Sequence, residues 1–192
     1  FLLKERPLLQ RSAALHCTTD QEAREITWLR LKAPNKVLAN PIELAQLHVD
    51  SAVGKAWLEQ MALPTDQPLL LVAGRLHHKK GLDLLPEVLK ALVHKPWQII
   101  FLGNDDDGTG RILRRKFDHL GLAGRCHWHS ALPVRELIGP YNAADWLLLP
   151  SRHENFGNVV VEALACGSGA LISDQVGVAD SLCGCPGVLV AE

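Results

Sequence analysis

From Pro68 onward, short hydrophobic runs alternate with stretches in which apolar residues recur every three or four positions. Uninterrupted apolar runs bounded by turn residues are typical of strands that are buried on both faces of a parallel sheet. These runs predict five strands, at residues 69–73, 99–102, 146–149, 170–172 and 188–190.

The stretches between these runs have the spacing of amphipathic helices. Repeated strand–helix–strand units of this length predict right-handed crossovers and an α/β fold with a doubly wound, Rossmann-like parallel sheet. The apolar stripes of the predicted helices are Leu82-Leu85-Val88-Leu89-Leu92, Ile112-Leu113-Phe117-Leu120, Val134-Leu137-Ile138-Tyr141 and residues 159–166.

The first 65 residues follow a different pattern. Strands are predicted at 13–19 and 36–40, and helices at 21–31 and 52–61. A polar stretch follows Pro41, so a break between two structural units is predicted near residues 39–44.

Composition narrows the classes of function. The 192 residues are 47% hydrophobic and 21% charged with a net charge of −1, which excludes a disordered chain and argues against a nucleic-acid partner. No run reaches the ~18 apolar residues of a membrane span. Five cysteines without zinc-type spacing predict reduced thiols and a cytoplasmic location, with contact to the inner membrane surface only through parts outside this sequence. Because the only methionine is Met61, we expect an excerpt of a longer protein.

Residues 74–81 form the first candidate site, a loop between a predicted strand and a predicted helix. Ligands of open α/β sheets bind at the carboxyl ends of strands. Gly74 allows close approach of the backbone, and Arg75 and Lys80 supply cations that suit a phosphate. The alternative is a solvated basic turn. The lysine is not in a GxxxxGK[ST] setting, so a nucleoside-triphosphate P-loop is excluded.

Residues 150–158 form the second candidate site, again directly after a predicted buried strand. Residues 156–158 are predicted to form the first turn of a helix, whose free N–H groups attract anions. Glu154 precedes this helix, and Glu162 lies inside an otherwise apolar helical stretch, where a carboxylate is costly unless it accepts hydrogen bonds. A helix with one solvated edge is the alternative; together the features favour a polyhydroxyl ligand that carries phosphate.

The order and spacing of these motifs resemble the C-terminal, donor-binding domain of the retaining GT-B glycosyltransferases of the "group 1" family. The resemblance extends from about residue 36 to the end of the chain, and Glu154 and Glu162 stand in that family's Glu-x7-Glu arrangement. The matching motifs are Gly74-Arg75, Lys80-Gly81, Pro150-Ser151-x-x-Glu154-x-Phe156-Gly157 and Glu162-Ala163-x-Ala165-x-Gly167.

The resemblance implies a role for each of these residues. Arg75 and Lys80 would hold the diphosphate of a nucleotide-sugar, Glu154 would contact the donor sugar, and Glu162 would bind the ribose. Arg75, Lys80 and Glu154 are thereby the implied catalytic residues, with no metal and no other cofactor required. Further donor contacts are implied at Gly74, Ser130, Asn155, Phe156, Gly157 and Asn158.

The resemblance also implies a division of the chain. Residues 1–40 would be the end of an N-terminal, acceptor-side domain, and residues 41–192 the donor-binding domain without its C-terminal helices. The implied partners are a nucleotide-sugar, an unspecified acceptor (glycan, lipid or small molecule) and the missing N-terminal domain; the excerpt alone is expected to bind donor without transferring sugar. A GT-B sugar-nucleotide epimerase and a non-catalytic nucleotide-sugar-binding partner protein remain alternatives.

Two motifs depart from the family's pattern. A proline of the family is missing at residues 167–172, and Asp180 stands where the family has glutamate. The second change puts the identity of the donor sugar in doubt, because it falls near the sugar.

Several other features are interpreted as structural. Asp105, Asp106 and Asp107 are typical of a solvated loop. His127 and His129 share one face of the strand that the resemblance implies at residues 126–130, but no third metal ligand is evident in the sequence. His77 and His78 are predicted to flank the phosphate loop, and the five tryptophans are predicted to pack inside the protein.

Overall fold

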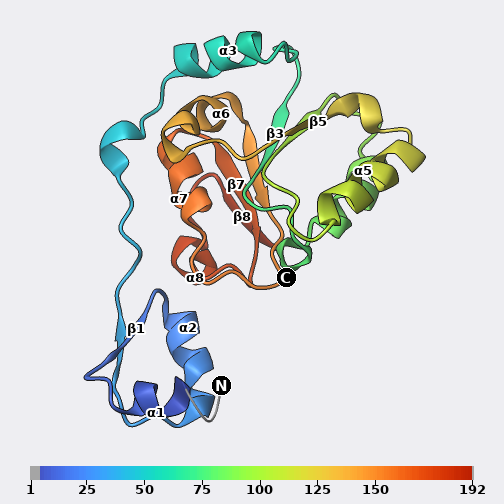
Figure 1. Ribbon diagram of the computed structural model, residues 1–192. Helices are drawn as coiled ribbons and strands as arrows, with labels where there is room; N and C mark the ends of the chain where they lie inside the picture. The colour runs from blue at the N-terminus through green and yellow to red at the C-terminus, as the bar shows by residue number, and fades with distance from the viewer. Residues whose placement is uncertain (1–4, 192) are drawn as a thin grey trace.

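The computed structural model describes residues 5–191, which form two parallel sheets (Figure 1). The smaller sheet pairs β1 with β2 near the N-terminus. Its elements are α1 (Glu5–Gln10), β1 (Leu15–Cys17), α2 (Asp20–Glu25), a 3-10 helix at Ile26–Leu29 and β2 (Asn35–Val37).

The larger sheet has six strands in the order β5-β4-β3-β6-β7-β8, and every neighbouring pair is parallel. This confirms the predicted doubly wound α/β fold, and all five strands predicted from hydrophobic runs are present. The strands are β3 (Leu69–Ala73), β4 (Gln98–Leu102), β5 (Cys126–His129), β6 (Trp146–Leu149), β7 (Gly169–Ser173) and β8 (Val188–Ala191).

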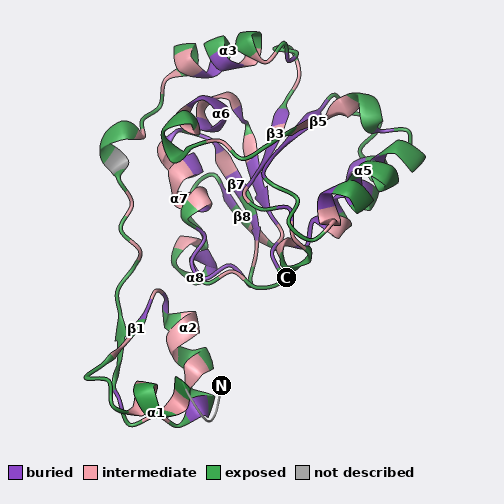
Figure 2. Cartoon of the chain, in the orientation of Figure 1, coloured by how far each residue is buried: buried purple, intermediate pink, exposed green. Residues whose placement is uncertain are grey.

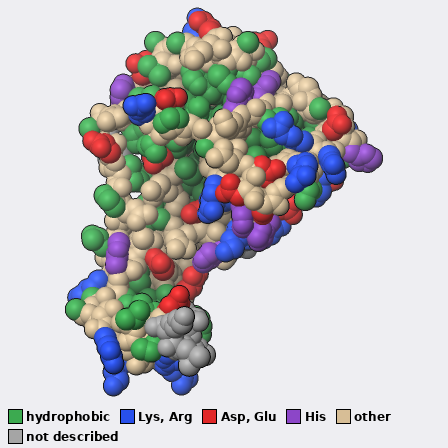
Figure 3. Space-filling model, viewed as in Figure 1, with side chains coloured by type: hydrophobic (Ala, Val, Ile, Leu, Met, Phe, Trp, Pro, Cys, Tyr) green, Lys and Arg blue, Asp and Glu red, His purple; other side chains and the backbone are tan. Residues whose placement is uncertain are grey.

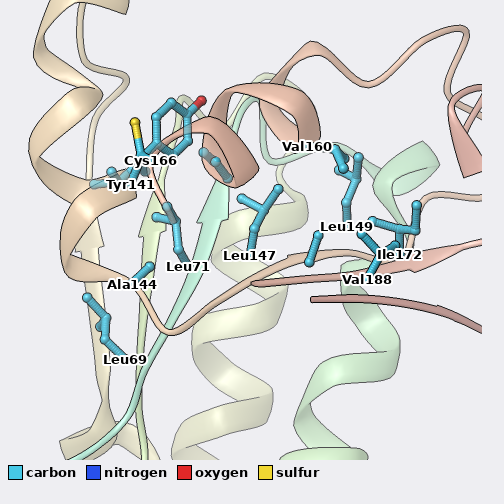
Figure 4. Close-up of a cluster of buried hydrophobic side chains, with 14 of the residues drawn as sticks. Leu69, Leu71, Tyr141, Ala144, Leu147, Leu149, Val160, Cys166, Ile172 and Val188 are labelled. Carbon is cyan, nitrogen blue, oxygen red and sulfur yellow. The ribbon is translucent and has the colours of Figure 1, made fainter. Parts of the chain in front are cut away.

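Side chains of the central strands alternate between two hydrophobic clusters, one on each face of the sheet. Leu71 of β3 and Leu147 of β6 belong to the first cluster, and Val72 and Leu148 to the second. Both faces are therefore buried, as Figure 2 shows for the centre of the molecule and Figure 4 for the side chains of the first cluster.

Different helices cover the two faces. The first cluster is covered by α3 (Ser51–Gln60), α6 (Ile138–Ala143), α7 (Asn158–Ala165) and α8 (Ala179–Leu182). The second is covered by α4 (Leu85–Ala91) and α5 (Thr109–His119).

Four residues of the predicted helical stripes are exposed instead of buried. Within α4, Leu85 and Leu89 are buried but Val88 is exposed, so the buried stripe is narrower than predicted. Leu92 lies at the C-terminal end of this helix, as its cap. The exposed residues are Val88, Leu92, Ile112 and Val134.

In the N-terminal region the helix predicted at 52–61 is confirmed as α3, shifted by one residue, whereas both strands and the first helix are shorter than predicted. The helix predicted at 21–31 ends at Glu25, where a 3-10 helix takes over and stops at Arg30, whose φ of 49° is left-handed. Trp28 is 72% exposed, so the prediction that it packs inside the protein was wrong.

The small N-terminal unit contacts the larger one at the end that carries the candidate site. Asn40 donates to Asn158 Oδ1 at 3.1 Å, and the hydroxyl of Thr19 donates to the Asn155 carbonyl at 3.3 Å. Arg24 forms an exposed ion pair with Asp180 at 2.9 Å. The division near residue 40 stays a prediction, and residues 38–43 between the two units have no helix or strand.

The surface carries charged side chains of both signs (Figure 3), and the cysteines are not paired with one another. On the face drawn in Figure 3, basic and acidic side chains are interspersed. The five cysteines are free thiols, and burial raises the pKa of Cys126 to about 12. Within residues 5–191, no helix has the length and hydrophobicity that crossing a bilayer requires.

Gly81 gives a test of how tightly the large sheet constrains its loops. Its φ of 64° is left-handed, and an added Cβ would overlap the carbonyl oxygen of Pro150. We expect Gly81→Ala to lower the free energy of unfolding by at least about 2 kcal/mol, because strain and overlap act together. Gly124→Ala is the control, since nothing lies within 4 Å of its added Cβ. Urea denaturation that gives equal midpoints for the two variants would refute this constraint.

Candidate functional site

The candidate site lies where the order of strands reverses. β3 and β6 are hydrogen-bonded neighbours in the middle of the sheet. After β3 the chain builds outward through β4 and β5, whereas after β6 it builds in the opposite direction through β7 and β8. The carboxyl ends of β3 and β6 are therefore the point at which the strand order switches direction, which is the usual place for a ligand in such a sheet.

The two loops are held against each other by the backbone and by Arg152. The Arg152 N–H donates to the Lys79 carbonyl at 2.8 Å. The guanidinium of Arg152 grips both carboxylate oxygens of Asp83, at 2.7 and 2.8 Å, and donates to the His78 carbonyl at 2.9 Å. The bond from Arg152 lowers the pKa of the Asp83 carboxyl, so this link is charged at neutral pH.

Lys80, from the loop after β3, forms an ion pair with Glu154, from the loop after β6. The Lys80 ammonium donates to Glu154 Oε2, and their side chains are only 21% and 22% exposed. The backbone fixes Glu154 on both sides, because its N–H donates to the Gln175 carbonyl at 3.1 Å and its own carbonyl accepts from Gly177 at 2.8 Å. A partly buried pair of this kind places one cation and one carboxylate at a defined point.

The start of α7 differs from the prediction by two residues. The helix begins at Asn158 and its cap is Gly157, whose φ of 98° is left-handed, so Phe156 and Gly157 do not form its first turn. Phe156 is buried in the core next to this turn. Asn155 lies in the preceding loop, where its carbonyl accepts from the N-terminal unit.

Glu162 lies one turn into α7 and has a partner that the sequence did not identify. The buried Tyr141 hydroxyl donates to Glu162 Oε2 at 2.7 Å. Burial, followed by this bond, raises the pKa of Tyr141, so the phenol stays a donor. Tyr141 was assigned only to an apolar stripe; its phenol and the lone glutamate on the facing helix were the available signal. The same two residues line a small pocket with Ile42, Leu47 and Ile138.

The remaining predicted residues lie around this end of the sheet without joining one cluster. Arg75 is exposed, and its Nη1 lies 3.8 Å from Asp106 Oδ2. Gly74 has a φ of 127°, which turns the chain out of β3. Ser130 is exposed at the end of β5 and lines a second pocket with Asn104. Lys80 and Glu154 are thus brought together, whereas the ion pair of Arg75 is with Asp106.

Comparison with known proteins identifies the family. The sequence profile described as "Glycosyl transferases group 1" matches residues 55–186. The chain belongs to this glycosyltransferase family. The matched region extends from α3 to the residues just before β8 and includes the whole candidate site.

Curated relatives of this group 1 domain are longer proteins. It is 30% identical over 174 residues to a D-inositol 3-phosphate glycosyltransferase of Xylanimonas cellulosilytica, covering 87% of this chain and 42% of the relative. It is 36% identical over 126 residues to a glycogen synthase of Paracoccus denitrificans, covering 65% of this chain and 26% of the relative. The chain therefore spans less than half the length of these relatives.

Solved structures share the fold of this group 1 domain. Sucrose-phosphate synthase of Thermosynechococcus elongatus superposes with a TM-score of 0.85 at 22% identity, over 97% of this chain and 47% of that one. HepE of Anabaena, in complex with UDP and glucose, gives 0.83 at 18% identity, over 96% and 51%.

Tyr141→Phe tests whether the phenol stabilises Glu162. Removing a hydrogen bond to a charged acceptor should lower the free energy of unfolding by about 1.5 kcal/mol. The same change in a Glu162→Ala background should cost much less, because the acceptor is gone. Urea denaturation of the four proteins gives the coupling energy, and a coupling near zero would show that the contact is energetically silent.

Proposed function

We propose that this chain is the nucleotide-sugar-binding part of a retaining glycosyltransferase, which transfers a sugar from a nucleoside diphosphate to an acceptor. The observation that carries the proposal is the pairing of Lys80 with Glu154 at the switch point of the sheet. A cation and a carboxylate side by side suit a ligand that carries phosphate next to hydroxyl groups. Family membership and a fold shared with a UDP complex support the same class of ligand.

In this proposal Lys80 binds the diphosphate without giving up Glu154. A lysine ammonium has three N–H donors, of which Glu154 takes one. The remaining donors can bind diphosphate oxygens. Arg75 is exposed on a loop at the same edge of the sheet and can turn toward the diphosphate by rotating its side chain alone.

The proposed catalytic effect is stabilisation of the leaving group. When the bond from the anomeric carbon to the phosphate oxygen breaks, the electron pair stays on the nucleoside diphosphate. Cations fixed beside that group stabilise the transition state more than the bound donor, because the negative charge grows during the step. Lys80 and Arg75 supply these charges in the proposal, so the transfer needs no metal.

The two glutamates have different proposed roles. Glu154 lies beside Lys80 and would accept hydrogen bonds from hydroxyls of the donor sugar. Glu162 keeps one carboxylate oxygen on Tyr141, and its other oxygen would accept from the ribose hydroxyls.

The full-length protein tests the activity itself. A thermal-shift panel of UDP-, GDP- and ADP-sugars would identify the donor, since a ligand of the native state raises the melting temperature. Labelled donor is then incubated with and without candidate acceptors. Sugar on the acceptor supports the proposal, whereas an epimerised donor or unchanged donor would contradict it in favour of an epimerase or a binding protein.

The diphosphate clamp predicts a graded loss of affinity. Lys80→Ala and Arg75→Ala should each weaken nucleoside-diphosphate binding by about 1.5 to 3 kcal/mol, the scale of a charge-assisted hydrogen bond. Lys79→Ala is the matched control, because Lys79 is exposed on the same loop and should change affinity little. Calorimetry that finds all three variants equal to the parent would rule out the clamp.

Substitutions of the two glutamates should affect different parts of donor binding. Glu162→Gln should weaken binding of the nucleoside diphosphate itself by roughly 1 kcal/mol, because a neutral acceptor binds ribose hydroxyls less strongly. Glu154→Gln should leave that affinity nearly unchanged and weaken binding of the sugar-bearing donor. The opposite ranking in calorimetry would reverse the assignment of the two residues.

A further inference from the structure

Two imidazoles of the loop at residues 74–81 lie close to a carboxylate of the loop that follows β4. Ligand atoms of His77, His78 and Asp107 all lie within 4.8 Å of one another. Asp107 Oδ2 is 2.9 Å from His78 Nδ1 and 3.6 Å from His77 Nε2. In a tetrahedral zinc site with bonds of about 2.0 to 2.1 Å, neighbouring ligand atoms lie about 3.3 to 3.4 Å apart. One of the two distances from Asp107 is shorter than this value, and the other is longer.

The backbone brings these residues together from two parts of the sequence. The chain after β3 pairs with the chain after β4, since the Leu76 N–H donates to the Asn104 carbonyl at 2.8 Å. Asp107 is then held in place by the backbone N–H groups of His78, at 3.1 Å, and Thr109, at 3.0 Å. The carboxylate is therefore positioned before any ligand binds.

The protonation of the two rings fits metal binding with two adjustments. His78 Nδ1 donates to Asp107 Oδ2 at 2.9 Å, so ligation through Nδ1 moves its proton to Nε2, and the metal then takes the place of that hydrogen bond. His77 Nδ1 accepts a 3.2 Å bond from the Lys79 N–H, so ligation through Nε2 moves the ring proton to Nδ1 and breaks that bond. Lys79 is exposed, and water can replace the lost acceptor.

We propose that His77, His78 and Asp107 bind a divalent transition metal of the Zn²⁺ type. Two imidazole nitrogens favour Zn²⁺ over Mg²⁺ and Ca²⁺, which prefer oxygen ligands. Three protein ligands leave one position of a tetrahedral site for water. The bound metal would link the loop after β3 to the loop after β4. The site is independent of the proposed donor chemistry, because none of its three residues is assigned to the donor.

Zinc titration of this chain by calorimetry tests the proposal. The background should be Cys183→Ser, Cys185→Ser, because both thiols are exposed and would bind Zn²⁺ themselves. We expect one Zn²⁺ per chain, with affinity reduced at least about tenfold by His78→Ala and by Asp107→Asn. Asparagine keeps an acceptor for the Thr109 N–H, so this variant should retain the loop. His94→Ala removes an exposed histidine elsewhere and should not change the affinity.

A second readout separates loss of the site from loss of the fold. Zn²⁺ should raise the melting temperature of the background protein and of His94→Ala, but not of Asp107→Asn, and Mg²⁺ should not compete. Without metal, all variants should melt within a few degrees of one another. No zinc binding in the background without Cys183 and Cys185, or equal affinity in all variants, would overturn the proposal.

Discussion

The close approach of the backbones at the carboxyl ends of β3, β4 and β6 determines the geometry of the loops that follow these strands. Side chains larger than hydrogen do not fit at two points of contact. A Cβ on Gly81 would overlap the Pro150 carbonyl, and one on Gly103 would overlap the carbonyl of Gly74. Because these contacts are between backbones, neighbouring side chains cannot relieve them by changing rotamer. The glycines therefore allow loops from separate strands to lie against one another.

Charged side chains at the ends of β3 and β6 form ion pairs with one another. Lys80 pairs with Glu154, Arg152 pairs with Asp83, and each pair joins the loop after β6 to the segment after β3. Lys80 and Glu154 are partly buried, so leaving one of them unpaired would cost desolvation energy, and their pairing favours the arrangement in which the two loops lie together. The same groups that could bind a nucleotide-sugar thus also stabilise the folded loops, which limits how far they can move apart.

The hydrophobic runs of the sequence were sufficient to predict five strands of the large sheet, and its motifs were sufficient to predict the approximate position of the site. Strands that are buried on both faces have no polar residues to interrupt them, so their limits were visible in the hydrophobic runs. Helices were less well predicted, because apolar spacing alone does not show how wide the buried stripe is: Leu85 and Leu89 of α4 are buried, whereas Val88 is exposed. Motif order placed Lys80 and Glu154 at strand ends, and the topology then made them neighbours.

Contacts within the site were not predictable from spacing. The bond from Tyr141 to Glu162 depends on how α6 lies against α7, and the approach of Asp107 to His78 depends on the pairing of two loops. Neither distance along the chain nor residue type fixes such contacts. Three aspartates in a row were therefore interpreted as a solvated loop, and two adjacent histidines as flanking the phosphate loop, although the structure brings Asp107 to His77 and His78.

A crystal structure of this chain with the nucleoside diphosphate that stabilises it most would test the central claim most directly. The account predicts that the diphosphate lies within hydrogen-bonding distance of Lys80 and Arg75, between the loops that follow β3 and β6. It also predicts that the ribose hydroxyls contact Glu162 while Tyr141 keeps its bond to the same carboxylate. A diphosphate bound elsewhere, or a ribose that does not contact Glu162, would contradict the account.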